Sequence, residues 1–234
     1  MKAYDIKIEL MYSEPKVWRR VRMPADATFT RLHQIIQTVT NFQSEYLDNP
    51  YHLFQFDLDA EDILVTNDEE AYEEYQHYKK NRKRVDKQLA RLGKERAERE
   101  RQRLSTVVRK PTRLKIDNYL ETHGEIHYTY DFGDNWEFLI TLEGVVEDYH
   151  FGYPTLLDGA GDAPPEDVGG VPGFQEFLRV YNDPEDPEHE EMLEWAESQK
   201  FWPYDPEHVD QCLKHIHYKK TEWDKLDHDN YQLK

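Results

Sequence analysis

The sequence predicts an α+β fold, with a mixed, mainly antiparallel sheet packed by helices and a long basic helical insertion. Charged and apolar residues alternate near the N-terminus and again after residue 125, which is typical of half-buried strands. Apolar residues recur at helical spacing between these stretches and in the last third of the chain. Apolar residues make up only 38% of the 234 residues, but aromatic residues make up 13% and bury large areas, so we expect a folded core.

The first 23 residues predict an antiparallel hairpin. Residues 4–10 and 17–23 alternate in the strand period on either side of the turn SEPK. In the second strand Val17 and Val21 should face the core, while Arg20 should face outward.

A helix and a further strand follow this hairpin. Thr28 can cap a helix whose apolar residues recur up to Val39, and residues 52–59 then alternate as a strand. The resulting order of strand, strand, helix and strand gives the chain a β-grasp-like start.

Residues 67–104 predict one long helix. They include no proline and consist mostly of Glu, Lys, Arg, Gln and Ala, which are strong helix formers, and a kink is expected only near Gly93. We therefore divide the chain into a single α+β domain, formed by residues 1–67 and 112–234, and an inserted long basic helix at residues 68–111.

Charge is divided unevenly between the insertion and the rest of the chain. The protein is acidic, with a net charge of −18, yet residues 79–115 hold 16 of its 30 Lys and Arg against four acids, a net +12. The remainder therefore carries −30. Such an asymmetry points to a partner for the basic segment.

The second half of the chain predicts a strand hairpin, an irregular loop and helices. Residues 125–131 and 136–142 alternate in the strand period and are joined by FGDN. Residues 151–173 contain six of the ten glycines and four of the twelve prolines, so we expect no regular structure there. Apolar groups at helical spacing then predict helices around residues 174–181, 192–196 and 209–216.

Five stretches, in this order, resemble the plasmid pRiA4b ORF-3-like family, which includes the TnpR-like passenger protein of some insertion elements. They are KVWRRVRMPADATFTRLHQIIQ, HLFQFDLD, YTYDFGDNWEFLITLE, YPTLLDGAGDAPPEDVGGVPGFQEFL and DPEDPEHEEMLEW. The resemblance covers nearly the whole chain outside residues 68–111, and YDFGDNW together with PPEDVGG is its most specific part. It implies an α+β fold and a link to mobile elements, but no defined biochemical activity.

Two departures from the family pattern bear on function. Leu156, Ala163 and Val168 stand where relatives carry cysteine, so a thiolate metal site of such relatives would be absent here. Shorter relatives lack the basic insertion, which implies a role particular to this subgroup.

The segment YDFGDNW and the loop PPEDVGG supply the main candidate site. In one interpretation Gly133 supplies a positive φ angle, carboxylates bond to backbone amides, and the stiff loop packs against the turn. In the other interpretation the turn and the loop form a groove for a ligand or partner, lined by Tyr130, Asp131, Asp134, Asn135, Trp136, Glu166 and Asp167. The four carboxylates of this set, Asp131, Asp134, Glu166 and Asp167, could bind a divalent cation such as Mg²⁺ and support phosphodiester hydrolysis.

The basic helix is the main candidate for contact with a partner. Its apolar stripe is thin, so most of it should face water or another molecule. It is either a solvated helix stabilised by pairs such as Glu95 with Arg99, or it contacts nucleic acid, an acidic protein surface or a second copy of the chain through residues 79–113. The side chains expected to make this contact are Lys83, Arg84, Lys87, Arg91, Lys94, Arg99 and Arg103.

Several other chemistries fit the sequence poorly. DFG at residues 131–133 lacks the remaining kinase motifs, and the nucleophile motif G-x-S-x-G is absent. The single cysteine, Cys212, excludes an internal disulfide and lies on an apolar helical stripe, so we expect it in the core. A zinc site remains a weaker alternative, built from His33, His52, His123 and His127.

No segment resembles an export signal or a membrane span, so we expect a cytoplasmic protein without membrane contact. We predict no bound cofactor apart from the divalent cation of the alternative site. The sequence therefore favours a non-enzymatic binding or accessory protein. The alternative is a metal-dependent hydrolase or nuclease built on the four carboxylates.

Overall fold

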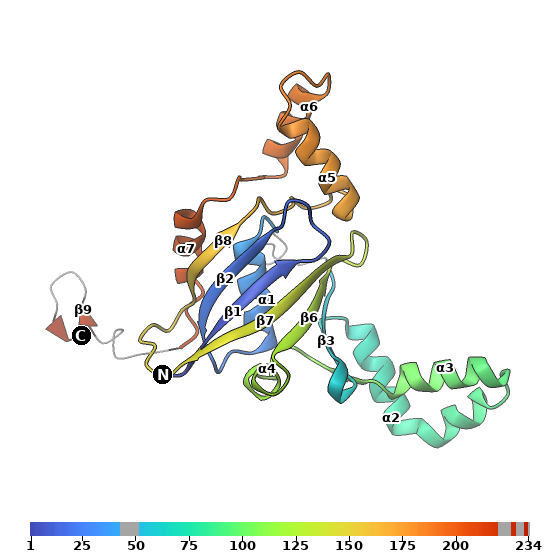
Figure 1. The fold of residues 1–234 in the computed structure, drawn as a ribbon. Coiled ribbons are helices and arrows are strands. Elements are labelled where there is room, and N and C mark those ends of the chain that lie inside the picture. Colours follow the sequence, from blue (N-terminus) through green and yellow to red (C-terminus); the bar gives the residue numbers. More distant parts are fainter. Residues whose placement is uncertain (43–51, 220–225, 228–231, 234) are drawn as a thin grey trace.

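Eight strands form one sheet in the computed structural model, which describes residues 1–42, 52–219, 226–227 and 232–233 (Figure 1). The order across the sheet is β5-β4-β3-β6-β7-β1-β2-β8, and neighbouring strands run antiparallel apart from the parallel pair β4 and β5. The mixed, mainly antiparallel sheet is therefore confirmed. The strands are β1 (Ala3–Leu10), β2 (Trp18–Pro24), β3 (Phe54–Leu58), β4 (Ile63–Thr66), β5 (Val107–Arg109), β6 (Glu125–Tyr130), β7 (Trp136–Val146) and β8 (Thr155–Ala160), and the short β9 (Leu226–Asp227) pairs separately with β10 (Gln232–Leu233).

The helices lie around this sheet and at two of its ends (Figure 1). The sheet's central strands are backed by α1, and α2 and α3 project from the edge that contains β3 to β5. The bounds are α1 (Phe29–Val39), α2 (Glu69–Leu89), α3 (Lys94–Ser105), α4 (Asp117–His123), α5 (Gly170–Tyr181), α6 (His189–Ser198) and α7 (Pro206–Lys214), with a 3₁₀ turn, η2, at Asp59–Glu61.

The predicted N-terminal hairpin is present in the sheet, between β7 and the edge strand β8. Strand β1 pairs with β2 on one side and with β7 on the other, and its alternate residues Tyr4 and Ile6 are fully buried. The opposite face carries cross-strand ion pairs such as Arg22 with Asp5, at 2.7 Å. One face of these strands therefore packs on the core while the other faces solvent.

An aromatic core joins α1 to the sheet. Thr28 caps the helix as predicted, because its side chain accepts a hydrogen bond from the Arg31 amide. Phe29 packs edge-on against Phe56 of β3, with ring centroids 5.1 Å apart. His33 stacks on a further β3 ring, that of Phe54, with the centroids 3.8 Å apart. Aromatic side chains thus supply much of the buried area of the core, although apolar residues make up only 38% of the sequence.

The basic insertion forms two antiparallel helices where the sequence predicted one. Helix α2 ends at Leu89, and after a short connection α3 begins at Lys94, directly after Gly93. Folding back buries Tyr75, Tyr78 and Ala97, which a single straight helix would leave in water. We call α2 and α3, residues 69–105, the basic hairpin.

The glycine-rich segment also differs from the prediction. Residues 155–160 form the edge strand β8, which pairs with β2, although we expected no regular structure between residues 151 and 173. The helices predicted after this segment are present as α5, α6 and α7. On α7, Leu213 fills the core, whereas Cys212 is only partly buried, contrary to prediction.

Candidate functional site

The turn between β6 and β7 is held by backbone-directed hydrogen bonds. Asp131 accepts one from the Gly133 amide through Oδ1, at 2.9 Å. The positive φ angles occur at Asp131 (52°) and Asn135 (54°), rather than at Gly133 as predicted. Asp and Asn are, after glycine, the residues that adopt this conformation most readily, so the sequence DFGDN encodes the turn through its polar residues.

The loop PPEDVGG packs directly against this turn. The Gly169 amide donates a hydrogen bond to Oδ2 of Asp134, at 3.1 Å. Gly170 has a φ of 68°, and a Cβ atom placed on it would lie 2.6 Å from the carbonyl oxygen of Asp134. The two motifs that carry the family resemblance are thus in contact, and Gly170 is required for that approach.

His52 brings the carboxylates of the turn and the loop together. Its Nδ1 lies 3.3 Å from Oδ1 of Asp131, and its Nε2 lies 3.7 Å from Oε2 of Glu166 and 4.0 Å from Oδ1 of Asp167. Tyr130 donates a buried hydrogen bond to Oε1 of Glu166, at 2.8 Å. We call His52, Asp131, Glu166 and Asp167 the histidine–carboxylate cluster.

The histidine–carboxylate cluster opens to solvent on one side. Asp131 and Glu166 are buried, at 8% and 6% exposure, whereas the side chain of Asp167 is 60% exposed. A solute could therefore reach the cluster past Asp167.

Only some of the predicted groove residues contribute to this cluster. Asp134 instead binds the Gly169 amide, and the Asn135 amide donates to Oε1 of Glu137, at 2.7 Å. Trp136 is fully buried beside Phe42 and Phe174, and the Tyr130 side chain is likewise buried, so neither lines an open groove. The four carboxylates predicted to converge are therefore three, with His52 in the place expected for Asp134.

His52 has a role here that the sequence did not reveal. It lies two residues before Phe54, and Phe54 pairs with Tyr130 across β3 and β6. This register places His52 next to the turn, and the Asp131 amide accordingly donates to the Leu53 carbonyl. Only the pairing of β3 with β6, which strand periodicity does not specify, could have identified it.

The mixed ligand set of the cluster suits a divalent metal ion. One ligand atom each from His52, Asp131 and Asp167 can be chosen so that all lie within 4.8 Å of one another. Imidazole nitrogen with carboxylate oxygen is a donor set used for Zn²⁺ and other transition metals.

The four histidines considered for a zinc site do not come together. His33 is buried in the core, where its Nδ1 lies 2.8 Å from the Tyr128 hydroxyl, and His123 contacts Glu61. His127 lies exposed on β6, between the buried residues Ile126 and Tyr128, and so points to the opposite face.

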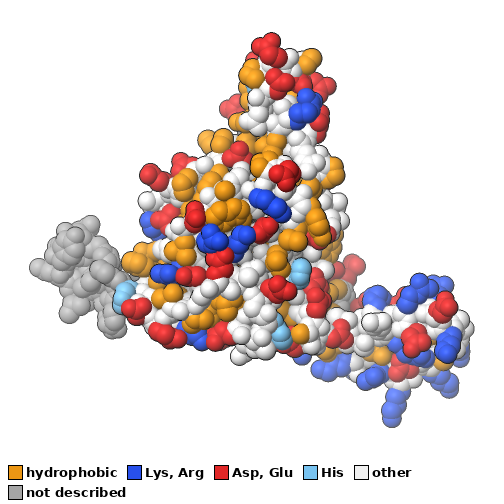
Figure 2. Space-filling model, in the orientation of Figure 1, with side chains coloured by type: hydrophobic (Ala, Val, Ile, Leu, Met, Phe, Trp, Pro, Cys, Tyr) orange, Lys and Arg blue, Asp and Glu red, His pale blue; other side chains and the backbone are white. Residues whose placement is uncertain are grey.

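The basic hairpin carries its positive charge on exposed side chains, and Figure 2 shows Lys and Arg gathered on it. Six of the seven side chains predicted to contact a partner are exposed, and within the described part of the chain they form no ion pair: Lys83, Arg84, Lys87, Arg91, Lys94 and Arg99. The predicted pair of Glu95 with Arg99 is accordingly absent there.

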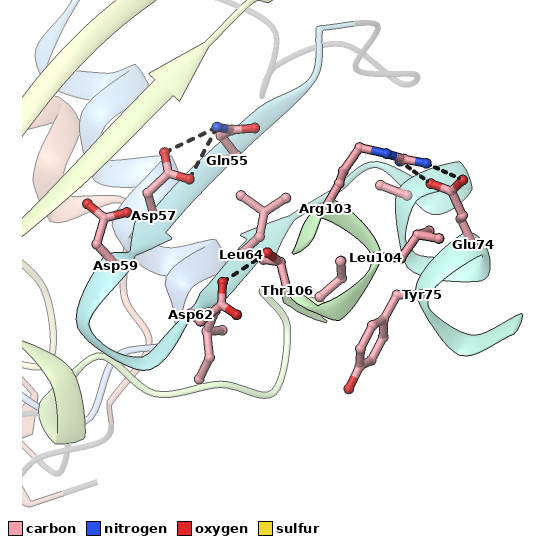
Figure 3. A pocket seen from close by; sticks show the side chains of 13 residues that line it. Gln55, Asp57, Asp59, Asp62, Leu64, Glu74, Tyr75, Arg103, Leu104 and Thr106 are labelled. Atoms are coloured by element: carbon pink, nitrogen blue, oxygen red, sulfur yellow. Dashed lines mark hydrogen bonds and ion pairs between the residues drawn. The ribbon is translucent and has the colours of Figure 1, made fainter. Parts of the chain in front are cut away.

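Arg103 differs from these six because it ties the two helices together. Its guanidinium donates to both carboxylate oxygens of Glu74, at 2.6 and 2.9 Å, at the base of the basic hairpin (Figure 3). A cavity of about 360 Å³ lies here between the hairpin and the sheet, and burial raises the pKa of its Asp57 carboxyl. The base of the hairpin is thus acidic while its exposed surface is basic.

These features define an α+β protein built on one largely antiparallel sheet, with a histidine–carboxylate cluster at one end of the central strands and a basic hairpin at the sheet edge. None of the helices in the described ranges is both long and apolar enough to cross a bilayer.

Comparison with known proteins agrees with this architecture. The family model described as plasmid pRiA4b ORF-3-like protein matches residues 2–212. The uncharacterized protein y4hQ of Sinorhizobium fredii is 30% identical over 196 residues, which cover 84% of this chain and 81% of that protein. The crystal structure of MM3350, a protein of unknown function from Methanosarcina mazei Go1, superposes with a TM-score of 0.60 at 27% identity and covers 88% of this chain and 96% of its own. The chain belongs to the plasmid pRiA4b ORF-3-like family.

Proposed function

We propose that this protein is a non-enzymatic binding module that holds the phosphate backbone of a nucleic acid with the basic hairpin. The observation that carries the proposal is the set of six exposed cationic side chains that have no ion-pair partner in the described structure. Unpaired Lys and Arg on a rod release counterions when they neutralise phosphates, which drives binding without any reading of base sequence.

A nucleic acid fits the surface of the basic hairpin better than an acidic protein does. Tyr75, Tyr78 and Ala97 are buried and so are not available for an interface, and Leu92, at 37% exposure, is the large apolar side chain of the basic hairpin that counts as exposed in the described structure. Protein interfaces require a desolvated, largely apolar centre, whereas phosphate contacts require only accessible cations.

The acidic remainder of the chain is compatible with this proposal because the hairpin projects from it (Figure 1). Helix α2 has 21 residues and is kinked at Asn81, so its two segments are roughly 18 and roughly 12 Å long. Charges in physiological salt are screened over about 8 Å, so a strand held at the far end of the hairpin is little affected by the body. Closer approach is repelled, which orients the nucleic acid along the outer surface.

Charge neutralisation tests the proposal. A variant with Lys83→Gln, Lys87→Gln and Arg91→Gln keeps helix-forming residues and removes three contacts. Fluorescence anisotropy with a labelled duplex of about 20 base pairs should show binding weakened roughly 500-fold at about 0.1 M salt, because each of the three lost phosphate contacts costs about eightfold there.

The matched control neutralises three exposed cations outside the basic hairpin. These are Lys16, Arg113 and Lys115. The control should bind as the unmodified protein does. Equal losses of DNA affinity in the two variants would show that only the net charge matters and would contradict the proposal. If the unmodified protein self-associates with rising concentration and the hairpin variant does not, the basic hairpin binds a second copy of the chain instead of nucleic acid, which would also contradict the proposal.

A second candidate function is metal-dependent hydrolysis at the histidine–carboxylate cluster. The convergence of His52, Asp131 and Asp167 supports it, since a metal held there with an open ligand position could activate water. Calorimetry with Zn²⁺, Mn²⁺ and Mg²⁺ should then show binding that Asp131→Asn abolishes. Asp134→Asn is the control, because Asp134 lies in the same turn but binds Gly169. No heat at millimolar metal, or no turnover of a phosphodiester by the loaded protein, would eliminate the hydrolase.

A further inference from the structure

A cavity of about 460 Å³ lies between α5 and α6. The two helices project from the body at the top of Figure 1, away from the basic hairpin. One face of each helix lines the cavity, and the end of the PPEDVGG loop closes it with Asp167 and Val168. We call it the α5–α6 cavity. Its volume is in the range of cavities that bind small molecules.

The floor of the cavity is apolar. Met192 and Trp195 lie three residues apart on α6, line the cavity and are only partly buried, as is Val168 from the loop. Phe177 of α5 is buried behind Trp195, edge to face with the ring centroids 5.7 Å apart, and so holds that ring in place. A bound molecule can therefore pack on the exposed parts of Met192, Trp195 and Val168, which we call the apolar floor.

The charged side chains that line the cavity in the described structure are all acidic. They are Asp167, Glu176, Glu188 and Glu191. Glu176 already binds the Arg179 guanidinium, at 2.7 and 2.9 Å. Glu188 and Glu191 are exposed and form no ion pair within the described ranges. These two carboxylates are therefore available to a cation, and they would repel an anion.

The acidic side chains lie at both ends of the cavity. Helix α6 starts beside the last turn of α5, because His189 Nδ1 lies 2.9 Å from the Val180 carbonyl oxygen. Glu188 is therefore at the C-terminal end of α5, whereas the exposed Asp167 precedes the N-terminus of that helix. Negative charge at two ends with an apolar floor between them fits a ligand whose cationic groups are joined by an apolar chain.

We propose that the α5–α6 cavity binds a linear aliphatic polyamine. Its ammonium groups pair with Glu188 and Glu191 at one end and with Asp167 at the other, and its methylene chain lies on the apolar floor. Alkylamines are protonated at neutral pH, as the lysine side chain is, so they donate charge-assisted hydrogen bonds to carboxylates. Removal of the methylene groups from water adds to the affinity. This site lies outside the basic hairpin and does not depend on nucleic-acid binding there.

Three probes separate this recognition from general attraction to an acidic protein. Spermidine and hexaamminecobalt(III) carry the same charge, but only spermidine has an aliphatic chain, and hexylamine has such a chain with a single ammonium group. Calorimetry at about 0.15 M salt should show spermidine binding on the order of tenfold more tightly than either of the others. Equal affinity for hexaamminecobalt(III) or for hexylamine would overturn the proposal.

Paired variants of α6 place the binding in the cavity. Glu188→Gln combined with Glu191→Gln should weaken spermidine binding roughly tenfold, because two ion pairs with the ligand are lost. The control combines Glu190→Gln with Glu194→Gln, which are exposed on the same helix, do not line the cavity and change the charge equally. The control should bind spermidine as the unmodified protein does, and all three proteins should have similar melting temperatures. Equal weakening in both variants, or none in the first, would overturn the proposal.

Discussion

The contact between the PPEDVGG loop and the hairpin turn predicts the effect of Gly170→Ala. A left-handed φ costs an alanine roughly 1–2 kcal/mol relative to glycine. The added Cβ would also lie 2.6 Å from the Asp134 carbonyl oxygen, so the backbone of the loop or the turn must move. Such overpacking costs about 1–3 kcal/mol. We therefore expect Gly170→Ala to lower the free energy of unfolding by about 2–5 kcal/mol.

Gly124→Ala is the control that separates these two contributions. Gly124 has a similar φ of 79°, but a Cβ atom there would meet nothing within 4 Å. Urea denaturation should show a loss of about 1–2 kcal/mol for Gly124→Ala, clearly less than for Gly170→Ala. Equal losses in the two variants would refute the argument that the loop and the turn are held together by close backbone approach at Gly170.

Two further substitutions test the core and its titration. Arg19→Met should lower the free energy of unfolding by about 3 kcal/mol because four backbone carbonyls lose a charged donor. The control Arg20→Met lies on the solvent face of the same strand, where Arg20 pairs with Glu143, and should cost less than about 1 kcal/mol in urea denaturation. A comparable loss in both would contradict the structural role of Arg19. Burial raises the pKa of Tyr149 from 10.0 to about 12. Between these two pH values the folded protein keeps a proton that the unfolded chain releases. The stability that this group contributes is therefore fully present below about pH 10 and is lost as the pH rises to about 12. Tyr149→Phe should therefore lose stability less steeply across this pH range when unfolding is measured at intervals, and an unchanged slope would contradict the burial argument.

The elements that the sequence predicted are those whose own residues specify them. The hairpin of β6 and β7 follows from alternation around FGDN, and α1 follows from its cap and apolar spacing. Strands β4, β5 and β8 were missed because they are short or poor in apolar residues, and a strand of this kind is defined by the neighbour with which it pairs. Helix α4, of seven residues, was missed for a similar reason.

The basic insertion shows the limit of local propensity. Its residues favour a helix throughout, and they do form helices, but propensity does not say whether one helix continues or folds back. The decision rests on the burial of Tyr75, Tyr78 and Ala97 between the two helices and on the pairing of Arg103 with Glu74. These contacts join residues about thirty positions apart, and helical periodicity carries no information about them.

The candidate site was predictable in part. The convergence of Asp131 with Glu166 and Asp167 follows from the proximity expected for the two motifs, whereas His52 required knowledge of strand order. The sequence did indicate that Arg19 faces the core, because Arg19 shares the strand parity of the apolar residues Val17 and Val21.

The dependence of binding on salt tests the central claim most directly. If the six exposed cations of the basic hairpin all contact phosphates, the slope of log K against log salt concentration for duplex DNA approaches about −5, and the variant with Lys83, Lys87 and Arg91 changed to Gln should have a slope nearer −3. A slope that is the same in both proteins would contradict the account. The account would also be contradicted if binding of the unmodified protein did not weaken as the salt concentration rises from about 50 to about 200 mM, the range over which phosphate contacts lose affinity.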